Sequence, residues 1–422
     1  MQDLIAYVEQ LGQSARRAAM QLVTLDGATK VAALRMIAQA IRDHTDALLV
    51  ANAEDVKAAE AAQLDAPLVH RLRLDAKKVA AMADSVDQIA AQTDPVGQTL
   101  EGYVRPNGLR IEKRRVPLGV VLFFYESRPN VTSDAAALCL KSGNAVILRG
   151  GKEAFHSNRA IVQIIAAALN DAKIEPAAVQ LVESTDRALV PHLLKLDKYI
   201  DLVIPRGGES LIRAVVKDST IPVLKHFTGN CHIYIDAEIA GMDEQVTKIC
   251  VNAKTSYPGG AVCNAVEHLL VHESVAARVL PKVCGELAAK EVEIRGDEKT
   301  RSIYRAAKPA TPQDWDTEYL NFIVGIKVVS SIDEAIDHIN RHGSHHTDAI
   351  LSSSARNIEQ FVTRVDSASV MVNASTRFAD GGEYGLGAEI GISTDKLHAR
   401  GPMGASDLTT YKWIVTGDGH VR

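Results

Sequence analysis

Cysteine is scarce in this 422-residue sequence, and its five cysteines are widely separated. None forms a Cys-x-x-Cys pair, so neither a zinc knuckle nor a disulfide framework is predicted. The sequence also lacks a charge-free apolar run of roughly 18 residues, the length that a membrane-spanning helix needs. Its amino-terminal stretch carries acidic side chains and has no apolar core of the kind found in secretion signals. We therefore expect a cytoplasmic protein with free thiols and without a membrane partner.

Neither sign of charge dominates the sequence. The formal net charge is −5, which gives no general attraction to nucleic acid, so no nucleic-acid partner is predicted. A hydrophobic content of 46% and a charged content of 23% are ordinary for a globular protein. A chain of this length is too long for one hydrophobic core, so we expect two or three domains.

The sequence pattern changes several times along the chain. Residues 1–94 place apolar side chains at three- and four-residue spacing, which is typical of amphipathic helices. Two polar, basic arms then flank Asn107-Gly108, a pair that favours a β-hairpin. From Val120, and again from Cys231, short apolar runs alternate with helical patterns. This alternation predicts two α/β domains with parallel sheets that are covered on both faces.

Cys263 is the candidate nucleophile. It follows the loop Tyr257-Pro258-Gly259-Gly260, which would expose its thiol. We expect Cys263 to lie at the start of a helix, where main-chain N–H groups would stabilise a thiolate and an oxyanion. Cys139, Cys250 and Cys284 lie inside apolar helical patterns and are expected to be buried in the core.

The segment VNAKTSYPGGAVCNAVEHLLVH, residues 251–272, resembles the active-site stretch of the gamma-glutamyl phosphate reductases, a branch of the aldehyde dehydrogenase superfamily. Further matches include residues 125–154 and 380–394, and the amino-terminal helices and about residues 273–315 are most divergent. The resemblance implies an aldehyde-dehydrogenase-like α/β fold with a Rossmann-type cofactor domain, a second α/β catalytic domain and a small β oligomerisation element. We place the cofactor domain at residues 1–97, 117–228 and 385–404, the catalytic domain at 229–384, and the oligomerisation element at 98–116 and 405–422.

The resemblance also implies a reaction: NADPH reduces L-glutamate 5-phosphate to L-glutamate 5-semialdehyde, with release of phosphate, in proline biosynthesis. The thiolate of Cys263 would form a thioester, which hydride from the nicotinamide would reduce. A glutamate 5-kinase is a candidate partner, and a homodimer or a homotetramer is expected because the hairpin and the carboxyl-terminal strand would extend a neighbour's sheet.

By the same resemblance, the expected cofactor-binding residues are Arg149, Lys152, Arg206, Gly207, Gly208 and Glu318. Lys152 stands where superfamily members have a glutamate, and a cation there favours the 2′-phosphate of NADPH over the free ribose of NADH. The glycine pair resembles a pyrophosphate-binding turn, and Glu318 stands where relatives hold the nicotinamide ribose. Without the resemblance, two basic residues at a strand end also fit a solvated rim, and two glycines fit a simple turn.

The expected substrate-binding residues are Arg128, Asn373 and Arg377, with Arg377 suited to hold the α-carboxylate of a glutamyl group. Asn130 is the candidate side-chain donor to the oxyanion, although Glu126 occupies the position that aligns with the amide of hydrolytic relatives.

Two alternatives remain open at this point. An aldehyde-oxidising dehydrogenase would need a water-activating glutamate, but the aligned segment around Lys225 and His226 has no carboxylate; His226 itself is either a base or a linker histidine. A non-enzymatic descendant of the fold would have lost the nucleophile and the cofactor turn, and both are present. The histidines at 342, 345 and 346 fit a solvated loop better than a zinc site, so no metal is expected.

Overall fold

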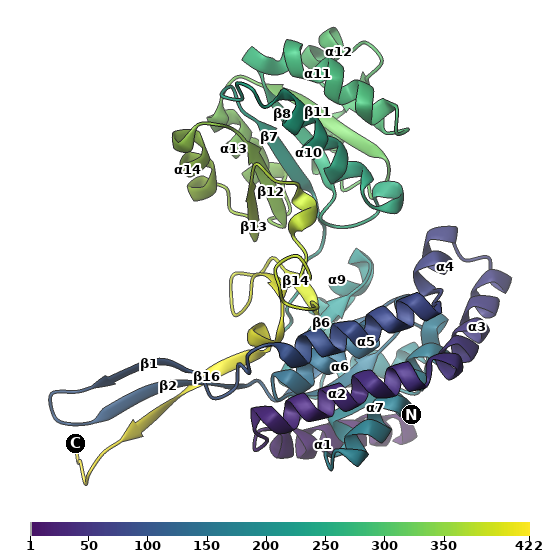
Figure 1. The fold of residues 1–422 in the computed structure, drawn as a ribbon, viewed down its shortest axis with the longest axis vertical. Coiled ribbons are helices and arrows are strands. Elements are labelled where there is room, and N and C mark those ends of the chain that lie inside the picture. Colours follow the sequence, from purple (N-terminus) through teal and green to yellow (C-terminus); the bar gives the residue numbers. More distant parts are fainter. Residues whose placement is uncertain (1) are drawn as a thin grey trace. The chain divides into compact units, whose positions relative to one another are not determined.

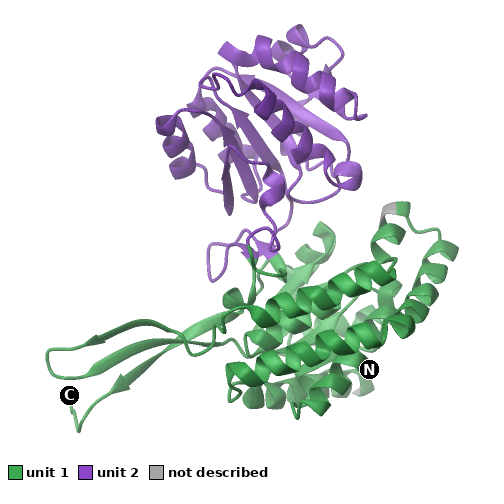
Figure 2. Cartoon of the chain, in the orientation of Figure 1, with its two compact units in different colours: residues 1–225, 385–391, 403–422 green, residues 226–384, 392–402 purple. Residues whose placement is uncertain are grey.

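The computed structural model describes residues 2–422, which form two compact units (Figure 2). The first unit comprises residues 1–225, 385–391 and 403–422, and the second comprises residues 226–384 and 392–402. The sequence predicts that residues 385–404 belong entirely to the first domain. Residues 392–402 belong instead to the second unit, where Lys396 and Arg400 pair with the carboxylate of Asp366 at 2.7 and 2.9 Å.

The first unit begins with the predicted helical region and continues into an α/β layer (Figure 1). Its helices are α1 (Gln2–Leu22), α2 (Gly27–Asp43), α3 (Thr45–Ala61), α4 (Ala66–Leu72), α5 (Ala76–Ala91), α6 (Asn130–Lys141), α7 (Phe155–Asp171), α8 (Val190–Leu193) and α9 (Glu209–Asp218). Its strands are β1 (Thr99–Val104), β2 (Arg110–Pro117), β3 (Val120–Tyr125), β4 (Ala145–Arg149), β5 (Val179–Leu181), β6 (Leu202–Arg206) and β16 (Thr409–Thr416). Strands β14 (Gly391–Ser393) and β15 (Gly401–Met403) form a two-stranded sheet where the chain passes between the units.

The sheet of the first unit is parallel, in the order β5-β4-β3-β6. Every side chain of β3 is buried, which explains why this strand is uniformly apolar. The predicted parallel arrangement is therefore confirmed. The apolar stretch at Pro222 is not a strand, because Val223 forms only an isolated bridge to Val203.

The predicted hairpin is formed by β1 and β2, which pair in antiparallel register, and β16 adds to the other edge of β2. In Figure 1 these three strands extend from the first unit as a separate ribbon. The ribbon exposes large apolar side chains, namely Leu100, Tyr103, Val104, Tyr411, Trp413 and Val415.

The second unit is also a parallel α/β layer. Its helices are α10 (Asp243–Thr255), α11 (Glu273–Ala288), α12 (Glu298–Ile303), α13 (Ile332–His342) and α14 (Ala355–Arg364). Its strands are β7 (Cys231–Ile235), β8 (Val266–His272), β9 (Glu293–Gly296), β10 (Lys308–Pro309), β11 (Ile323–Val329), β12 (Thr347–Leu351) and β13 (Ser369–Val372). Their order in the sheet is β10-β9-β11-β8-β7-β12-β13.

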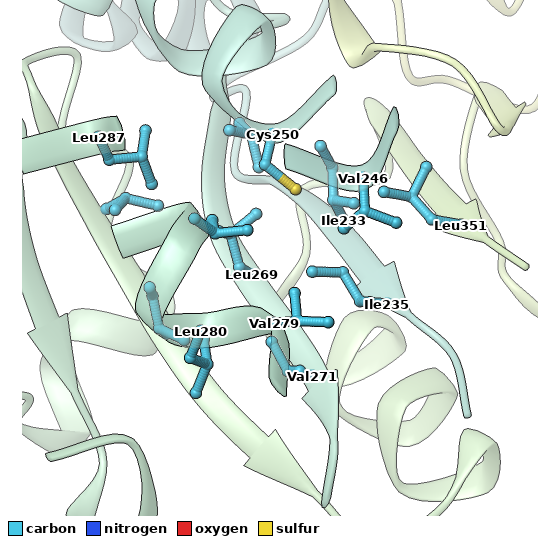
Figure 3. Packing of buried hydrophobic residues seen from close by; sticks show 14 of the residues in the cluster. Ile233, Ile235, Val246, Cys250, Leu269, Val271, Val279, Leu280, Leu287 and Leu351 are labelled. Carbon is cyan, nitrogen blue, oxygen red and sulfur yellow. The ribbon is translucent and has the colours of Figure 1, made fainter. Parts of the chain in front are cut away.

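The core of the second unit lies between this sheet and helices α10 and α11. Figure 3 shows Ile233 and Leu269 from neighbouring strands packed near Cys250 and Leu280 from the two helices. Cys250 is fully buried, as expected, and so are Cys139 and Cys284. The sequence analysis missed β9 and β10, which are short, and β10 is exposed to solvent. No helix among residues 2–422 has both the length and the apolar character to cross a membrane.

Candidate active site

Cys263 lies in a turn between a short 3-10 helix, Pro258–Gly260, and strand β8. The expectation that it begins a helix is wrong. Gly259 and Gly260 have φ values of 66° and 64°, which break the helical path before Cys263, and the run after Cys263 becomes strand β8, whose residues are buried except for the last, His272. The loop fits tightly, because a Cβ atom at Gly229 would lie 2.0 Å from the carbonyl oxygen of Cys263.

Two histidines flank this thiol in place of a helix terminus. The Cys263 sulfur and one ring nitrogen each of His226 and His346 lie within 4.8 Å of one another. The two imidazole rings are 5.3 Å apart between centroids and meet edge to face. Nδ1 of His226 lies 2.8 Å from the carbonyl oxygen of Ile392, and Nδ1 of His346 lies 2.9 Å from Oγ1 of Thr347. Nε2 of His346 is buried and has no nitrogen or oxygen partner, and the His346 ring interacts with the sulfur of Cys263.

The sheet order explains why residues from three distant segments meet. His226, Cys263 and His346 precede β7, β8 and β12 respectively, and these strands are neighbours in the order β8-β7-β12. The amino ends of parallel strands lie at the same edge of a sheet, so the three side chains gather there. His345, next to His346 in the sequence, does not join the cluster and instead contacts the carbonyl oxygen of Asp366 at 2.6 Å. The prediction that His346 lies in a solvated loop is wrong, because its side chain is fully buried.

The electrostatics of this cluster favour a thiolate. Burial alone raises the pKa of Cys263, but the charge of His346 and hydrogen bonds from His226 and His346 outweigh that effect. The net result is a pKa well below the ordinary range of a thiol. Cys231, next to it, shows the opposite behaviour: its pKa is raised by burial, and its thiol donates to the carbonyl of Cys263 at 3.1 Å.

Glu318 also belongs to the surroundings of this thiol. Burial raises the pKa of its carboxyl group, a hydrogen bond from the backbone of Gly229 opposes that shift, and the thiolate of Cys263 adds to it. Glu318 lies in the second unit, whereas the basic residues predicted with it lie in the first. Its role toward the nicotinamide ribose stays a prediction.

Arg377 contacts Asn264, the residue that follows Cys263 in the sequence. Its side chain contacts Oδ1 of Asn264, donates from Nε to Oγ of Ser256 at 3.2 Å, and packs over the ring of Tyr257. Asn264 also donates to the carbonyl oxygen of Ala379 at 2.9 Å. These contacts place a guanidinium group beside the thiol loop.

Asn373 has a different environment. Its side-chain amide bonds to both the N–H and the carbonyl of Ser352, each at 2.9 Å, and its φ is 52°. Both of its polar atoms therefore hold the backbone where β12 ends.

A cavity of about 490 Å³ in the first unit is lined by Arg149 and Lys152, two of the residues predicted to bind the cofactor. It is lined by Phe124, Tyr125, Glu126, Arg149, Gly150, Gly151, Lys152, Glu153, Thr185, Arg187, Val190, Pro191, Ser210, Leu211 and Ala214. Arg187 was missed by sequence reasoning, because it lies in a polar segment after β5 that carries no motif. Burial lowers the pKa of Arg149, the charge of Arg187 lowers it further, and Nε of Arg149 is buried without a partner. The cavity thus brings three cationic side chains together with the carboxylates of Glu126 and Glu153.

The predicted glycine turn connects β6 to α9. The N–H of Gly208, the residue before this helix, donates to the carboxylate of Glu126 at 3.1 Å. Glu126 thus occupies the helix terminus where a phosphate was expected. The adjacent Arg206 pairs with Glu389 at 3.2 Å.

The remaining predicted residues lie where β3 leads into α6. Asn130 begins this helix and donates its amide to Asp134 at 3.1 Å. Arg128 lies in the preceding loop, in which Ser127 has a φ of 44° and donates from its N–H and its hydroxyl to Glu153.

Comparison with known proteins identifies the family of this chain. The model of the aldehyde dehydrogenase family matches residues 5–302. A gamma-glutamyl phosphate reductase from Caldanaerobacter subterraneus is 51% identical over 98% of this chain and 99% of its own length. A reductase of the same name from Moorella thermoacetica is 50% identical over 98% of each chain. The chain belongs to the gamma-glutamyl phosphate reductase family.

Solved structures give the same result. The crystal structure of gamma-glutamyl phosphate reductase from Thermotoga maritima superposes with a TM-score of 0.95 at 44% identity, covering 98% of this chain and 99% of that one. An acetylating aldehyde dehydrogenase from Geobacillus thermoglucosidasius shares the fold, with a TM-score of 0.70 at 18% identity over 100% of this chain and 98% of its own. The protein is therefore an oxidoreductase with the aldehyde-dehydrogenase-like fold that the sequence predicts.

Proposed function

We propose that this protein reduces L-glutamate 5-phosphate to L-glutamate 5-semialdehyde, with NADPH as the reductant and a thioester on Cys263 as the intermediate. The observation that carries the proposal is the thiol of Cys263 between His226 and His346, at a pKa that keeps it ionised. A thiolate is the form that attacks an acyl carbon, and phosphate is a leaving group that needs little assistance.

The residues of the second unit have separate roles in this reaction. The sulfur of Cys263 bonds to the acyl carbon while the carbon–oxygen bond to phosphate breaks. His226 and His346 stabilise the thiolate before the attack, and again when it leaves the thiohemiacetal. When bound, NADPH supplies the hydride that reduces the thioester. Asn130 gives its amide to Asp134, so we propose the main-chain N–H of Cys263 as the oxyanion donor.

The cavity around Arg149 supports NADPH as the cofactor. Arg149, Lys152 and Arg187 all line this cavity, and Nε of Arg149 lacks a partner. A 2′-phosphate would supply the missing anion. The nearby carboxylate of Glu153 accepts from both the N–H and the hydroxyl of Ser127, so it is engaged away from a ribose. The three basic residues would hold the phosphate, which NADH lacks.

Arg377 is our candidate for the α-carboxylate of the substrate. Its guanidinium group lies beside Asn264 and Ser256, both near the nucleophile. Asn373 holds the backbone of Ser352, so we assign it a positioning role.

The ribbon of β1, β2 and β16 is our candidate for self-association. Tyr411, Trp413 and Val415 alternate along one strand and remain about half exposed in a single chain. Such a ribbon is stable when another copy covers it. Light scattering at a known protein concentration should give a dimer or a tetramer.

A second candidate function is oxidation of an aldehyde to a free acid, and Glu318 favours it. Its carboxyl group interacts electrostatically with Cys263, and a carboxylate beside the thiol is the group that would activate a water molecule against a thioester. The two functions differ in their need for phosphate.

The reverse reaction separates them. Purified protein is mixed with glutamate semialdehyde and NADP⁺, and absorbance follows NADPH with and without phosphate. We expect sustained turnover only with phosphate or arsenate, and none with Cys263→Ser. Sustained turnover in the absence of both anions would establish hydrolysis and refute the proposed function.

A further inference from the structure

Cys263, His226 and His346 form a donor set with a second chemical capability. A thiolate sulfur and two imidazole nitrogens are common ligands of zinc, and here they lie within 4.8 Å of one another. Zinc with three protein ligands keeps a fourth position for water. In such a tetrahedral site the donor atoms are about 3.5 Å apart, so a bound ion would draw them together by about 1 Å.

Both histidines are held in the way that metal-binding histidines are held. Nδ1 of His226 faces the carbonyl oxygen of Ile392, and Nδ1 of His346 faces the hydroxyl of Thr347. A ring that donates its Nδ1–H to oxygen presents the lone pair of Nε2, and such outer contacts orient zinc ligands. Nε2 of His346 is buried without a nitrogen or oxygen partner, so the sulfur of Cys263 or a ligand bound to that sulfur is what satisfies it.

We propose that Cys263, His226 and His346 bind a divalent cation of the zinc type, with water as the fourth ligand, and that the ion reversibly blocks the nucleophile. On binding, the sulfur lone pair bonds to the metal and any thiol proton leaves to solvent, so the sulfur no longer attacks carbon. Glu318 adds negative charge, because its carboxyl group interacts electrostatically with all three side chains. The inference does not rest on the proposed reaction, since metal binding needs no substrate.

Equilibrium dialysis of the chelator-treated, full-length protein against Zn²⁺, without substrates, measures the site directly. We expect one tightly held ion per chain, released by EDTA. Cys263→Ser, His226→Ala and His346→Ala should each weaken zinc binding by at least about tenfold. His345→Asn is the matched control, because this neighbouring ring turns toward Asp366 and asparagine tolerates its φ of 61°. The control should bind zinc as the unmodified protein does.

Two further measurements identify the sulfur ligand without any turnover. Zn²⁺ should protect Cys263 from iodoacetamide, as read by mass spectrometry of the modified peptide. Co²⁺ in place of Zn²⁺ should give a thiolate-to-metal charge-transfer band, which Cys263→Ser abolishes. Melting temperatures equal to that of the unmodified protein would show that the variants are folded.

Failure to bind zinc in the unmodified protein, or equal binding by the folded variants, would overturn the metal site. These outcomes are independent of the phosphate requirement. A protein that turns over without phosphate but still binds zinc at Cys263 would refute only the proposed reaction.

Discussion

Replacing His346 should slow the alkylation of Cys263 strongly at mildly acidic pH. The two side chains are at most 4.8 Å apart, and that of His346 is fully buried. Two unit charges at this distance attract by about 3 kcal/mol when the effective dielectric constant is about 20. An attraction of this size changes the thiolate population on the order of a hundredfold at a pH below the ordinary thiol pKa.

The assay is the rate of iodoacetamide modification across a pH series, followed by mass spectrometry. In the unmodified protein the rate should stay high well below about pH 8.5, the usual pKa of a free cysteine. His346→Ala and the bulkier His346→Gln should both lose that reactivity at about pH 6 and recover it as pH rises. His345→Asn, one residue away, should leave the profile unchanged. Rates in both His346 variants within about twofold of the unmodified protein at every pH would refute the electrostatic argument.

Four further outcomes are expected. Lys152→Glu should raise the Kd for NADPH by at least about tenfold and the Kd for NADH by much less, as measured by fluorescence titration. Equal increases in the two Kd values would show that Lys152 does not bind the 2′-phosphate. Arg377→Lys should raise KM for the semialdehyde more than it lowers kcat, because a point charge replaces a bidentate donor. Glu267 pairs with Lys254 at 2.7 Å, and both side chains are fully buried, so Glu267→Gln should cost about 3 kcal/mol in chemical denaturation, whereas the double change Glu267→Leu with Lys254→Met should cost less. Burial and neighbouring histidines hold the pKa of His338 at about 2. Below about pH 6.5 the unfolded chain therefore takes up a proton at this residue that the folded chain does not. The free energy of unfolding should fall by about 2 kcal/mol at about pH 5, and His338→Gln should remove this contribution.

The buried strands could be predicted because burial on both faces requires a continuous run of apolar residues in the sequence. The apolar runs at Val120, Ala145 and Leu202 became β3, β4 and β6, since a strand covered on both faces must be apolar throughout. The stretch at Pro222 looks similar but forms only one bridge, because proline has no N–H to donate to a ladder. Short or exposed strands such as β10 carry no such pattern.

Cys263 could be singled out from the sequence, but the two histidines beside it could not. Cys263 follows a recognisable glycine loop, whereas His226 and His346 meet it only because β8, β7 and β12 are neighbours in the sheet. Strand order depends on long-range packing, which local pattern does not record. The helix expected after Cys263 is absent because Val266–His272 pair with β7 and β11 as a strand. Arg187 went unnoticed because only the folded cavity brings it to Arg149.

The direct test of the central claim, a thioester on Cys263 that only phosphate releases, is a single-turnover experiment. The enzyme, at a concentration above about 1 µM, is mixed rapidly with glutamate semialdehyde and NADP⁺ in phosphate-free buffer. The amount of NADPH formed is then divided by the amount of active sites. We expect a burst of about one NADPH per active site, a glutamyl adduct on Cys263 in the mass spectrum, and renewed turnover when phosphate is added. Continuous NADPH formation without phosphate, or a burst with no adduct on Cys263, would contradict it.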